Sequence, residues 1–272
     1  MDVYLEEYSS DQAVRRYTHE TAGHGISYLL EHEYSKIYLR AIRDYLQTPK
    51  NQKLRVLEFG CGGGMNIITL LPLLERSGIA IQSAIGTDFS DTLIEAAKNE
   101  SKKLLVPAQQ EKLRFVTARN EQLISDMAQG LSASESELKD SFHVIVGVNT
   151  FRYCHRLGKE AECARDIAQL LIPGGICVMI DMNRKFPAFR SKFRDRKTKP
   201  AEERYLPTLE EYSSPFSNAG LQVLEKGNFC WVPHSAGPLL TTVCRSLSPL
   251  LNIFARPFAM RSLVISRRTL GR

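Results

Sequence analysis

The sequence lacks the features of several protein classes. Its 272 residues contain no internal repeat and only six scattered cysteines, which form no Cys-x-x-Cys pair. This argues against a disulfide framework or a zinc cluster and predicts reduced thiols. No apolar run approaches the roughly 20 residues of a membrane-spanning helix. Because the acidic N-terminus also lacks an apolar core, we predict no secretory signal and a cytoplasmic location.

The composition that remains is that of a globular protein. Apolar residues make up 43% of the chain and charged residues 24%, which excludes a wholly disordered chain and a collagen-like one. A length of 272 residues suits one large domain or a domain with extensions.

Positive charge is concentrated in two places. The net charge of +6 combines +7 in residues 184–200, +5 in residues 256–272 and −6 in the other 238 residues. Basic patches on a mildly acidic body suit anionic substrates, nucleic acid or a membrane surface. A solvated loop and a solvated tail account for them equally well.

Apolar segments and helical patterns alternate along the chain. Segments of strand character occur at 55–59, 79–87, 113–117, 142–148, 176–181, 221–232 and 261–266. Helical patterns occur at 26–46, 65–76, 90–103, 159–171, 208–219 and 239–254. Nearly continuous apolar strands that alternate with helices predict a parallel sheet with helices on both faces.

Several segments depart from this alternation. Residues 1–50 are predicted helical and hold seven of the ten tyrosines. The small, polar residues 130–141 predict a loop. Pro72 predicts a kink or break in its helix, and Pro249 an interruption in another.

The most informative segment is Val56-Leu-Glu-Phe-Gly-Cys-Gly-Gly-Gly64. Its glycines alternate through a turn between a buried strand and a helix, where they let a ligand approach the backbone closely. A dinucleotide fingerprint starting at Gly60 requires glycine where this chain has Met65. Glu58 is badly placed against a pyrophosphate and well placed to meet an ammonium group.

A second acidic residue ends the next strand, in Ile85-Gly-Thr-Asp-Phe-Ser90. A carboxylate at this position meets a ribose diol in doubly wound nucleotide-binding folds. Asp88 is therefore a candidate ribose ligand, and Phe89 beside it can lie against an adenine face. The alternative role for Asp88 is to cap a turn or helix. Ser90 is the predicted N-cap of the helix that follows.

Together these residues resemble the class I S-adenosylmethionine-dependent methyltransferases. Four segments carry the resemblance, in family order: Glu58 to Gly64, Asp88, Phe142 to Asn149, and Leu170 to Gly175. It implies an α/β fold with a Rossmann-like, doubly wound, mostly parallel seven-stranded sheet, and S-adenosyl-L-methionine as cofactor. We expect a helical N-terminal lid at 1–53, the cofactor-binding core at 54–183, and at 184–272 a basic linker plus a C-terminal extension that completes the sheet and pocket.

The resemblance also assigns cofactor-binding residues. These are Glu58, Gly60, Gly62, Gly64, Asp88, Phe89, Asn120 and Asn149. Asn120 occupies the place where many members have an acid that contacts the adenine amino group. The fourth strand has His143 where Asp is common, and we interpret this histidine as a strand-edge residue.

Methyl transfer by such an enzyme is an in-line attack on a sulfonium methyl group. The protein must align the reacting atoms, exclude water and, for a hydroxyl or ammonium acceptor, remove a proton. His24 and His234 are candidate bases, and Arg152 is a candidate for orienting an acceptor carboxylate or phosphate. The predicted acceptor-binding residues are Tyr17, Tyr28, Tyr153 and Trp231. No metal site is predicted, because Gly23 and Lys36 interrupt the two His-Glu starts of a zinc-protease motif.

The predicted acceptor is a small metabolite or natural-product intermediate, methylated on oxygen or nitrogen. One alternative is an RNA- or protein-directed enzyme that uses the basic stretches, although no nucleic-acid motif or module supports it. Another is a lipid-directed enzyme with an apolar stripe formed by Leu239, Leu240, Val243, Leu247, Leu251 and Phe254. Such a stripe is more often a core or homodimer face than a peripheral membrane contact. A non-catalytic subunit of methyltransferase fold is a further alternative.

Overall fold

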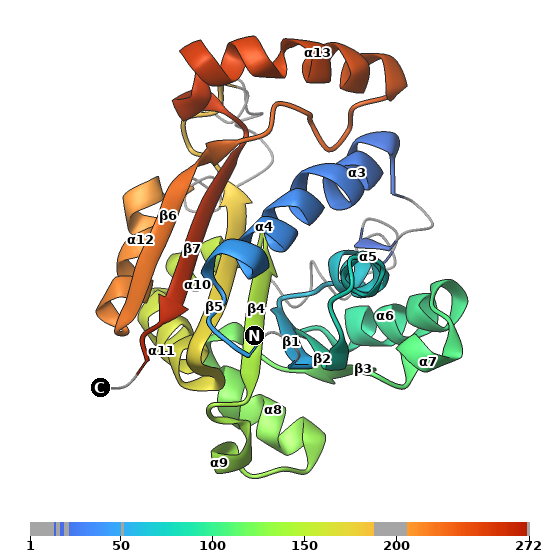
Figure 1. Ribbon diagram of the computed structural model, residues 1–272, viewed down its shortest axis with the longest axis vertical. Coiled ribbons are helices and arrows are strands. Elements are labelled where there is room, and N and C mark those ends of the chain that lie inside the picture. Colours follow the sequence, from blue (N-terminus) through green and yellow to red (C-terminus); the bar gives the residue numbers. More distant parts are fainter. Residues whose placement is uncertain (1–13, 15–16, 19–21, 50–51, 188–205, 271–272) are drawn as a thin grey trace.

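The computed structural model (Figure 1) describes residues 14, 17–18, 22–49, 52–187 and 206–270. Its centre is a seven-stranded sheet of order β3-β2-β1-β4-β5-β7-β6. The strands are β1 Leu54–Phe59, β2 Ile81–Asp88, β3 Leu113–Thr117, β4 Phe142–Val148, β5 Leu171–Met182, β6 Leu221–Phe229 and β7 Arg261–Arg268.

All strands of the sheet but one run in the same direction. The pairs among β3, β2, β1, β4 and β5 are parallel, whereas β7 is antiparallel to both β5 and β6. The prediction of a mostly parallel seven-stranded sheet is confirmed. The final two strands come from the predicted C-terminal extension and join the same sheet.

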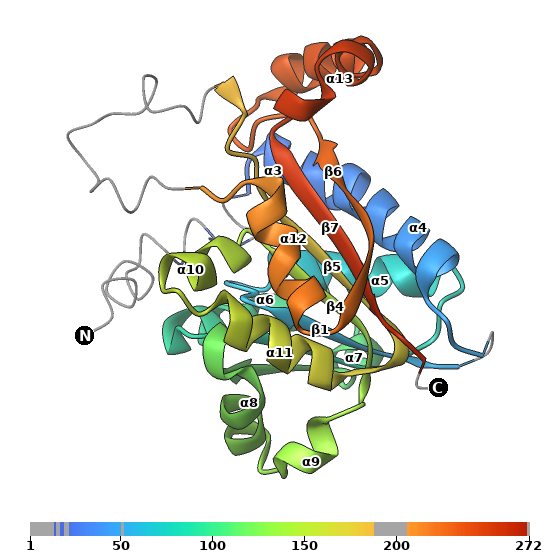
Figure 2. The ribbon, with the colours of Figure 1, turned by 90° about the vertical axis from the view of Figure 1, so that its left-hand side faces the viewer.

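Helices cover both faces, as the two views of the ribbon show (Figures 1 and 2). One face carries α3 His24–Tyr28, a π-helical turn η2 Leu29–Tyr34, α4 Ser35–Tyr45, α5 Met65–Arg76 and α6 Asp91–Leu104. The other carries α8 Leu123–Leu131, α10 Phe151–Arg156, α11 Glu160–Leu170 and α12 Leu209–Asn218.

The strands alternate between these two cores. Val144 and Val146 of β4 belong to the first apolar cluster, while Ile145 between them belongs to the second. Since successive side chains of a strand point to opposite faces, one nearly continuous apolar strand supplies both cores. This is the physical reason why its sequence shows no apolar–polar alternation.

Some local predictions were wrong. Pro72 lies inside an unbroken α5, whose buried residues Ile67, Leu71 and Leu74 hold the helix against the sheet. Pro249 likewise lies inside one continuous helix, α13 Pro238–Phe254. The predicted loop at 130–141 contains a short helix, α9 Glu135–Leu138, started by a capping box between Ser134 and Glu137.

The short remaining helical elements are α7 Pro107–Gln110, η3 Asn120–Gln122 and η7 Arg256–Phe258. Ser90 caps α6 as predicted, accepting a hydrogen bond from the backbone of Leu93. No helix among the described ranges is both long and apolar enough to cross a membrane. Residues 188–200 of the first basic stretch lie outside the described residues.

Candidate active site

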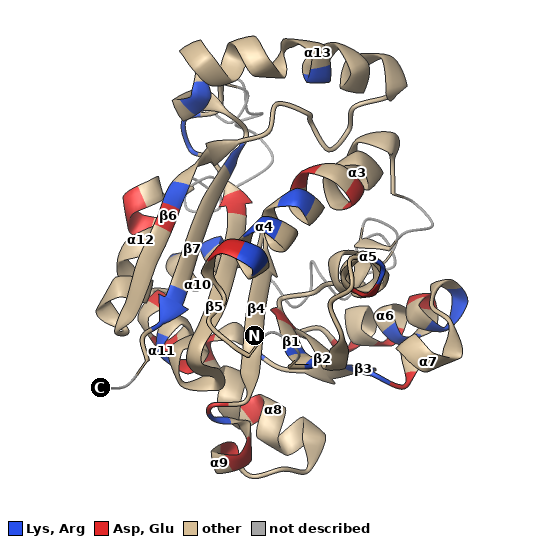
Figure 3. Ribbon diagram, viewed as in Figure 1, with Lys and Arg blue, Asp and Glu red and all other residues tan. Residues whose placement is uncertain are grey.

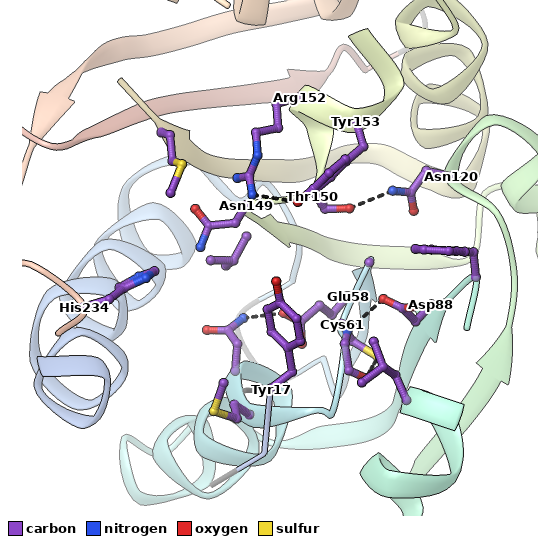
Figure 4. A pocket seen from close by; sticks show the side chains of 18 of the residues that line it. Tyr17, Glu58, Cys61, Asp88, Asn120, Asn149, Thr150, Arg152, Tyr153 and His234 are labelled. Carbon is purple, nitrogen blue, oxygen red and sulfur yellow. Dashed lines mark hydrogen bonds between the residues drawn. The ribbon is translucent and has the colours of Figure 1, made fainter. Parts of the chain in front are cut away.

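A cavity of about 640 Å³ opens where the parallel strands end (Figure 4). This is the edge at which open α/β sheets bind their ligands. Residues that follow β1, β2, β3 and β4 line it, together with residues of the N-terminal segment and of the loop before α13. The lining includes Tyr17, Tyr34, Glu58, Gly60, Gly62, Asp88, Phe89, Asn120, Asn149, Arg152, Tyr153 and His234.

The glycine turn after β1 has a backbone that only glycine adopts easily. Gly60 and Gly62 have φ of 62° and 55°, in the left-handed region. A Cβ atom on Gly60 would lie 1.9 Å from Thr150 Oγ1, at the start of α10. The turn therefore approaches the loop after β4 more closely than a side chain would allow.

Tyr17 lies directly on this turn. A Cβ atom on Gly63 would meet the Tyr17 carbonyl oxygen at 2.2 Å, and one on Gly62 would lie 3.6 Å from Tyr17 Cβ. The side chain of Tyr17 extends into the cavity above the turn (Figure 4). The lid at 1–53 stays a prediction, because most of residues 1–21 lie outside the described residues.

Asp88 connects the turn to the next helix. Its carboxylate accepts hydrogen bonds from the backbone N–H groups of Gly62 at 2.9 Å and Ser90 at 3.0 Å. Burial raises the pKa of this carboxyl to about 6, while the backbone hydrogen bonds act in the opposite direction. Asp88 therefore holds the loop in place and also lines the cavity. The same side chain can thus cap the turn and serve as a ribose ligand.

Glu58 is buried at the end of β1 and has one oxygen to spare. Its Oε1 accepts a hydrogen bond from Asn66 Nδ2 at 2.9 Å, whereas Oε2 has no partner among the described residues. Burial raises the pKa of Glu58 to about 8. A buried acceptor without a donor is costly, and a cationic group in the cavity would satisfy it.

Asn120, in the loop after β3, shows the same pattern. Its Nδ2 donates to Thr150 Oγ1 at 2.7 Å, and its buried Oδ1 receives no hydrogen bond from any described residue. An exocyclic amino group is the donor that this oxygen lacks. The spare oxygens of Glu58 and Asn120, with the Asp88 carboxylate between them along the strand ends, fit an amine-bearing nucleoside.

The other end of the cavity contains a buried ion pair. Arg152 Nη1 donates to Asp181 Oδ1 at 2.8 Å, and the Arg152 backbone N–H donates to Oδ2 at 3.0 Å. Asp181 is fully buried in β5. The guanidinium also lies 4.6 Å from the ring centre of Tyr153 and donates to its hydroxyl. Arg152 lines the cavity as predicted, with its charge balanced by Asp181.

A second buried arginine, Arg261 of β7, lies behind the cavity wall. Its Nη1 donates to Asn149 Oδ1 at 2.6 Å, and its Nη2 contacts His234 Nε2. A guanidinium has no acceptor, so Nε2 of His234 accepts and the proton of the neutral ring is on Nδ1. Burial, with help from Arg261 and Arg152, lowers the pKa of His234 well below its usual value. His234 is thus a neutral imidazole that lines the cavity and carries its proton on Nδ1.

Tyr34 of η2 is a cavity residue that sequence reasoning missed. Its side chain is 2% exposed, and its hydroxyl has no hydrogen-bond partner within the described part of the chain. Burial raises its pKa to about 12, so the hydroxyl keeps its proton. Leu30, Tyr34, Tyr38 and Ala41 are spaced as a buried helix face, but that spacing does not show which hydroxyl reaches a cavity.

Four predicted site residues do not line the cavity. His24 is exposed at the start of α3 and is not among the lining residues. Tyr28 donates to Glu33 at 2.7 Å, and Trp231 donates to Asn252 of α13 at 2.9 Å. Gly64 starts α5 behind the turn, where a Cβ atom would meet Ile68, Ala97 and Phe115. His143 accepts a hydrogen bond from the Arg55 backbone, in keeping with a strand-edge role.

Comparison with known proteins identifies the family of this chain. Residues 30–226 match the family described as methyltransferase domain. The chain belongs to this family. With the fold described above, it is a class I S-adenosylmethionine-dependent methyltransferase, and S-adenosylmethionine is its cofactor.

Solved structures share the fold of this methyltransferase. The citrinin polyketide synthase CMeT domain superimposes with a TM-score of 0.59 at 18% identity, over 97% of this chain and 59% of that one. The CurJ carbon methyltransferase superimposes with a TM-score of 0.56 at 16% identity, over 94% of this chain and 57% of that one. An S-adenosylmethionine-dependent methyltransferase from Mesorhizobium loti superimposes with a TM-score of 0.56 at 18% identity, over 88% of this chain and 100% of that one.

Curated relatives of the methyltransferase are far longer. The citrinin polyketide synthase of Monascus ruber is 29% identical over 137 residues, which are 50% of this chain and 4% of that protein. The non-reducing polyketide synthase sor2 of Hypocrea jecorina is 28% identical over 162 residues, 56% of this chain and 5% of that protein. This chain therefore spans about a twentieth of their length.

Proposed function

We propose that this methyltransferase methylates a small carbonyl compound at the acidic carbon next to the carbonyl group. That carbon would lose its proton to solvent and, as an enolate, form a bond to the methyl carbon while the methyl–sulfur bond breaks and S-adenosylhomocysteine leaves. The bound cofactor supplies an electrophilic methyl group on a sulfonium. The protein residues must therefore hold the acceptor in line and stabilise the negative charge on its oxygen. Oxygen and nitrogen acceptors, which the sequence analysis favours, are the alternatives.

The charge balance at the acceptor end carries this proposal. Arg152 is paired with the buried Asp181, so these two charges cancel. Arg261 is 0% exposed, and its guanidinium hydrogen-bonds to the neutral Asn149 and His234, with no carboxylate partner among the described residues. A buried cation without a counter-ion stabilises an anion that develops nearby.

Two neutral donors complete the oxyanion environment. Tyr34 presents a protonated hydroxyl that lacks a partner in the described structure, and His234 carries its proton on Nδ1. Arg261 acts through His234 and Asn149, because it donates to both and is not itself a lining residue. Donors that are already oriented need no reorganisation when the enolate forms.

The names of similar proteins support the same acceptor class. Two of the solved structures are a polyketide synthase CMeT domain and a carbon methyltransferase. The curated relatives are polyketide synthases. Identities below 25% make the solved structures a guide to fold, so we use their chemistry as a hypothesis for this chain.

The opposite end is proposed to hold the cofactor. Glu58 would accept from its ammonium group, Asp88 from the ribose hydroxyls, and Asn120 Oδ1 from the adenine amino group. Gly60 and Gly62 would let it lie against the backbone, with Phe89 beside the adenine and Asn149 between cofactor and acceptor. Tyr17 would cover the cofactor as part of the lid, and Tyr153 would contact the acceptor.

Isotope labelling tests the acceptor. The enzyme is incubated with methyl-¹³C cofactor and, in separate reactions, a β-keto thioester, a phenol and a primary amine. Two-dimensional NMR separates carbon-, oxygen- and nitrogen-bound methyl groups. We expect a carbon-bound methyl group on the thioester. Label on oxygen or nitrogen alone, or label found only in macromolecules of an added extract, would overturn the proposal.

Arg261→Met tests the charge. We expect kcat to fall roughly 100-fold, the size typical for the loss of an oxyanion-stabilising group. Binding of S-adenosylhomocysteine should stay unchanged, which also shows that the variant is folded. Arg267→Met, on the same strand, is the matched control because Arg267 Nη2 donates to Gln222 at the surface. Equal kcat values for both variants would argue against a role for Arg261.

A further inference from the structure

Helix α13 exposes an unusual amount of apolar surface. Leu239 and Phe254 are 79% exposed and Ile253 is 74% exposed, at the two ends of the helix. Between them the exposed large apolar residues are Leu240, Val243, Leu247 and Leu250. At 100° per residue all seven fall on one side of the helix. The sequence analysis interpreted the apolar stripe of this helix as a core or dimer face. In the structure, no described part of the chain covers these seven side chains.

The side of α13 that faces the protein is the polar one. Thr241 is its only buried residue. Arg245 lies 5.1 Å from the ring centre of Tyr28, and Asn252 accepts a hydrogen bond from Trp231 Nε1. The helix is therefore amphipathic with its apolar face outward, the reverse of a helix that packs on a core. In Figures 1 and 2 it lies beyond the end of the sheet, at the outer margin of the molecule.

Helix α13 itself carries no acidic residue. Residues 238–254 contain Arg245 and no Asp or Glu. The exposed Arg256 follows the C-terminal end of α13, and no acidic residue is coloured on α13 in Figure 3. Arg184 and Lys185 follow β5 near its end, where Asn183 donates to the carbonyl oxygens of residues 257 and 259 just beyond the helix.

We propose that α13 is an interfacial helix by which this methyltransferase docks on an anionic lipid bilayer. Leucine, isoleucine and phenylalanine side chains would enter the boundary of the acyl chains, while Arg256, Arg184 and Lys185 would meet lipid phosphates. An outward apolar face with basic flanks is the pattern of such helices. The contact is peripheral, since 17 residues lying along a surface do not cross it.

The charge distribution favours a lipid surface over a second copy of the chain. A two-fold dimer brings the same patch of both subunits together. Two copies of α13 would bring no acidic residue to such a contact, because residues 238–254 contain none, so the basic residues beside the helix would find no partner on it. An anionic bilayer satisfies the apolar face and the arginines together.

Docking through α13 would also place the cavity close to the lipid. The loop that enters α13 carries His234, which lines the cavity, and α13 packs against α3. An apolar acceptor could then pass from the bilayer to the site over a short path. The membrane proposal itself does not depend on the identity of the acceptor.

Vesicle flotation with the full chain tests the proposal. Vesicles of phosphatidylcholine mixed with phosphatidylglycerol are compared with vesicles of phosphatidylcholine alone, at low and high salt. We expect flotation with the anionic vesicles, weaker flotation at high salt and little with the neutral ones. Absence of flotation with anionic vesicles would overturn the proposal.

The variant Leu239→Ser/Leu250→Ser/Ile253→Ser removes apolar surface without touching the packed side of α13. We expect its partition to anionic vesicles to fall at least roughly tenfold, as expected for the loss of three large apolar contacts. Leu104→Ser/Val106→Ser is the matched control, because these side chains are 51% and 57% exposed on a distant part of the molecule.

A folding control and two contrary outcomes complete the test. Methyl transfer to a water-soluble acceptor should be the same for the triple variant and the wild type, which shows that the variant is folded. Equal loss of flotation in the triple and control variants would overturn the assignment to α13. A wild-type dimer in sedimentation velocity that the triple variant converts to a monomer would assign this face to self-association instead.

Discussion

Asp88 and Gly62 join the second strand to the glycine turn. Asp88 Oδ2 accepts a hydrogen bond from the Gly62 N–H at 2.9 Å, while Oδ1 accepts one from the Ser90 N–H at 3.0 Å. One carboxylate thus fixes both the turn after β1 and the start of α6. These two segments border the end of the cavity where we place the cofactor.

Asp88→Asn is expected to weaken cofactor binding. An amide offers one acceptor oxygen where the carboxylate offers two, so one backbone N–H loses its partner. The affinity for S-adenosylhomocysteine should fall roughly tenfold or more, because a buried hydrogen bond to a charged group is worth about 1.5–3 kcal/mol. Isothermal titration calorimetry measures this. Asp91→Asn, at an exposed neighbouring acid, should bind like the wild type, and equal losses would contradict the assignment.

Glu58 is expected to release a proton when the cofactor binds. Burial raises its pKa to about 8, so the free protein holds this proton at pH 7. A cationic ligand stabilises the carboxylate and lowers that pKa, so affinity should rise from pH 6 to pH 8. Calorimetry in buffers of different ionisation enthalpy counts the proton. Release that is unchanged in Glu58→Gln would place the proton on another group.

The same raised pKa has a consequence for the stability of the cofactor-free protein. The folded state retains the Glu58 proton up to a pH of about 8, whereas the unfolded state loses it near 4.5. Between these values the folded state binds more protons, so the contribution of Glu58 to the free energy of unfolding decreases as pH rises. Glu58→Gln should remove this part of the pH dependence in urea denaturation.

The residues at the end of the cavity where we propose the cofactor could be predicted to lie together, because their positions depend on consecutive residues. A buried strand followed by alternating glycines, and an acid at the end of the next strand, specify a turn and a neighbouring carboxylate in a parallel sheet. The glycine turn and Asp88 both line the cavity. Asn120, predicted from its place after β3, lines it as well. The order of β5, β7 and β6 is set by contacts between distant segments, which residue periodicity does not encode.

The acceptor end was less predictable for the same reason. Tyr34, His234 and Arg261 come from η2, the loop before α13 and β7, and only the folded sheet brings them together. His24 had a suggestive flank of glycines, yet it is exposed outside the cavity. The stripe on α13 was visible in the sequence, but helical spacing shows only that one face is apolar, not whether that face points inward.

Tyr34→Phe and Tyr38→Phe are expected to have opposite effects. Tyr34 loses a buried hydroxyl without a described partner, so stability should stay the same or rise. If the hydroxyl stabilises the enolate oxygen, kcat should fall roughly tenfold. Tyr38 donates to Asn66 Oδ1 at 3.1 Å, so its change leaves a buried acceptor and should lower the free energy of unfolding by about 1–3 kcal/mol.

Thermal unfolding and steady-state kinetics separate the two tyrosines. Each protein serves as the control for the other, since both lose one phenolic hydroxyl from the same helical face. An unchanged kcat in Tyr34→Phe would remove this hydroxyl from the proposed oxyanion environment. A stability loss in Tyr34→Phe as large as that in Tyr38→Phe would show that Tyr34 has a structural partner.

Arg152→Met separates structural from catalytic loss at the buried ion pair. Asp181 is fully buried and would keep a charge without its guanidinium partner, so the free energy of unfolding should fall by about 3–5 kcal/mol. Adding Asp181→Asn neutralises that charge and should recover part of the stability in urea denaturation. If Arg152 orients the acceptor, kcat should stay low in the double variant although the protein is more stable. Recovery of kcat together with stability would make Arg152 a structural residue, and the acceptor would then depend on Arg261, His234 and Tyr34 alone.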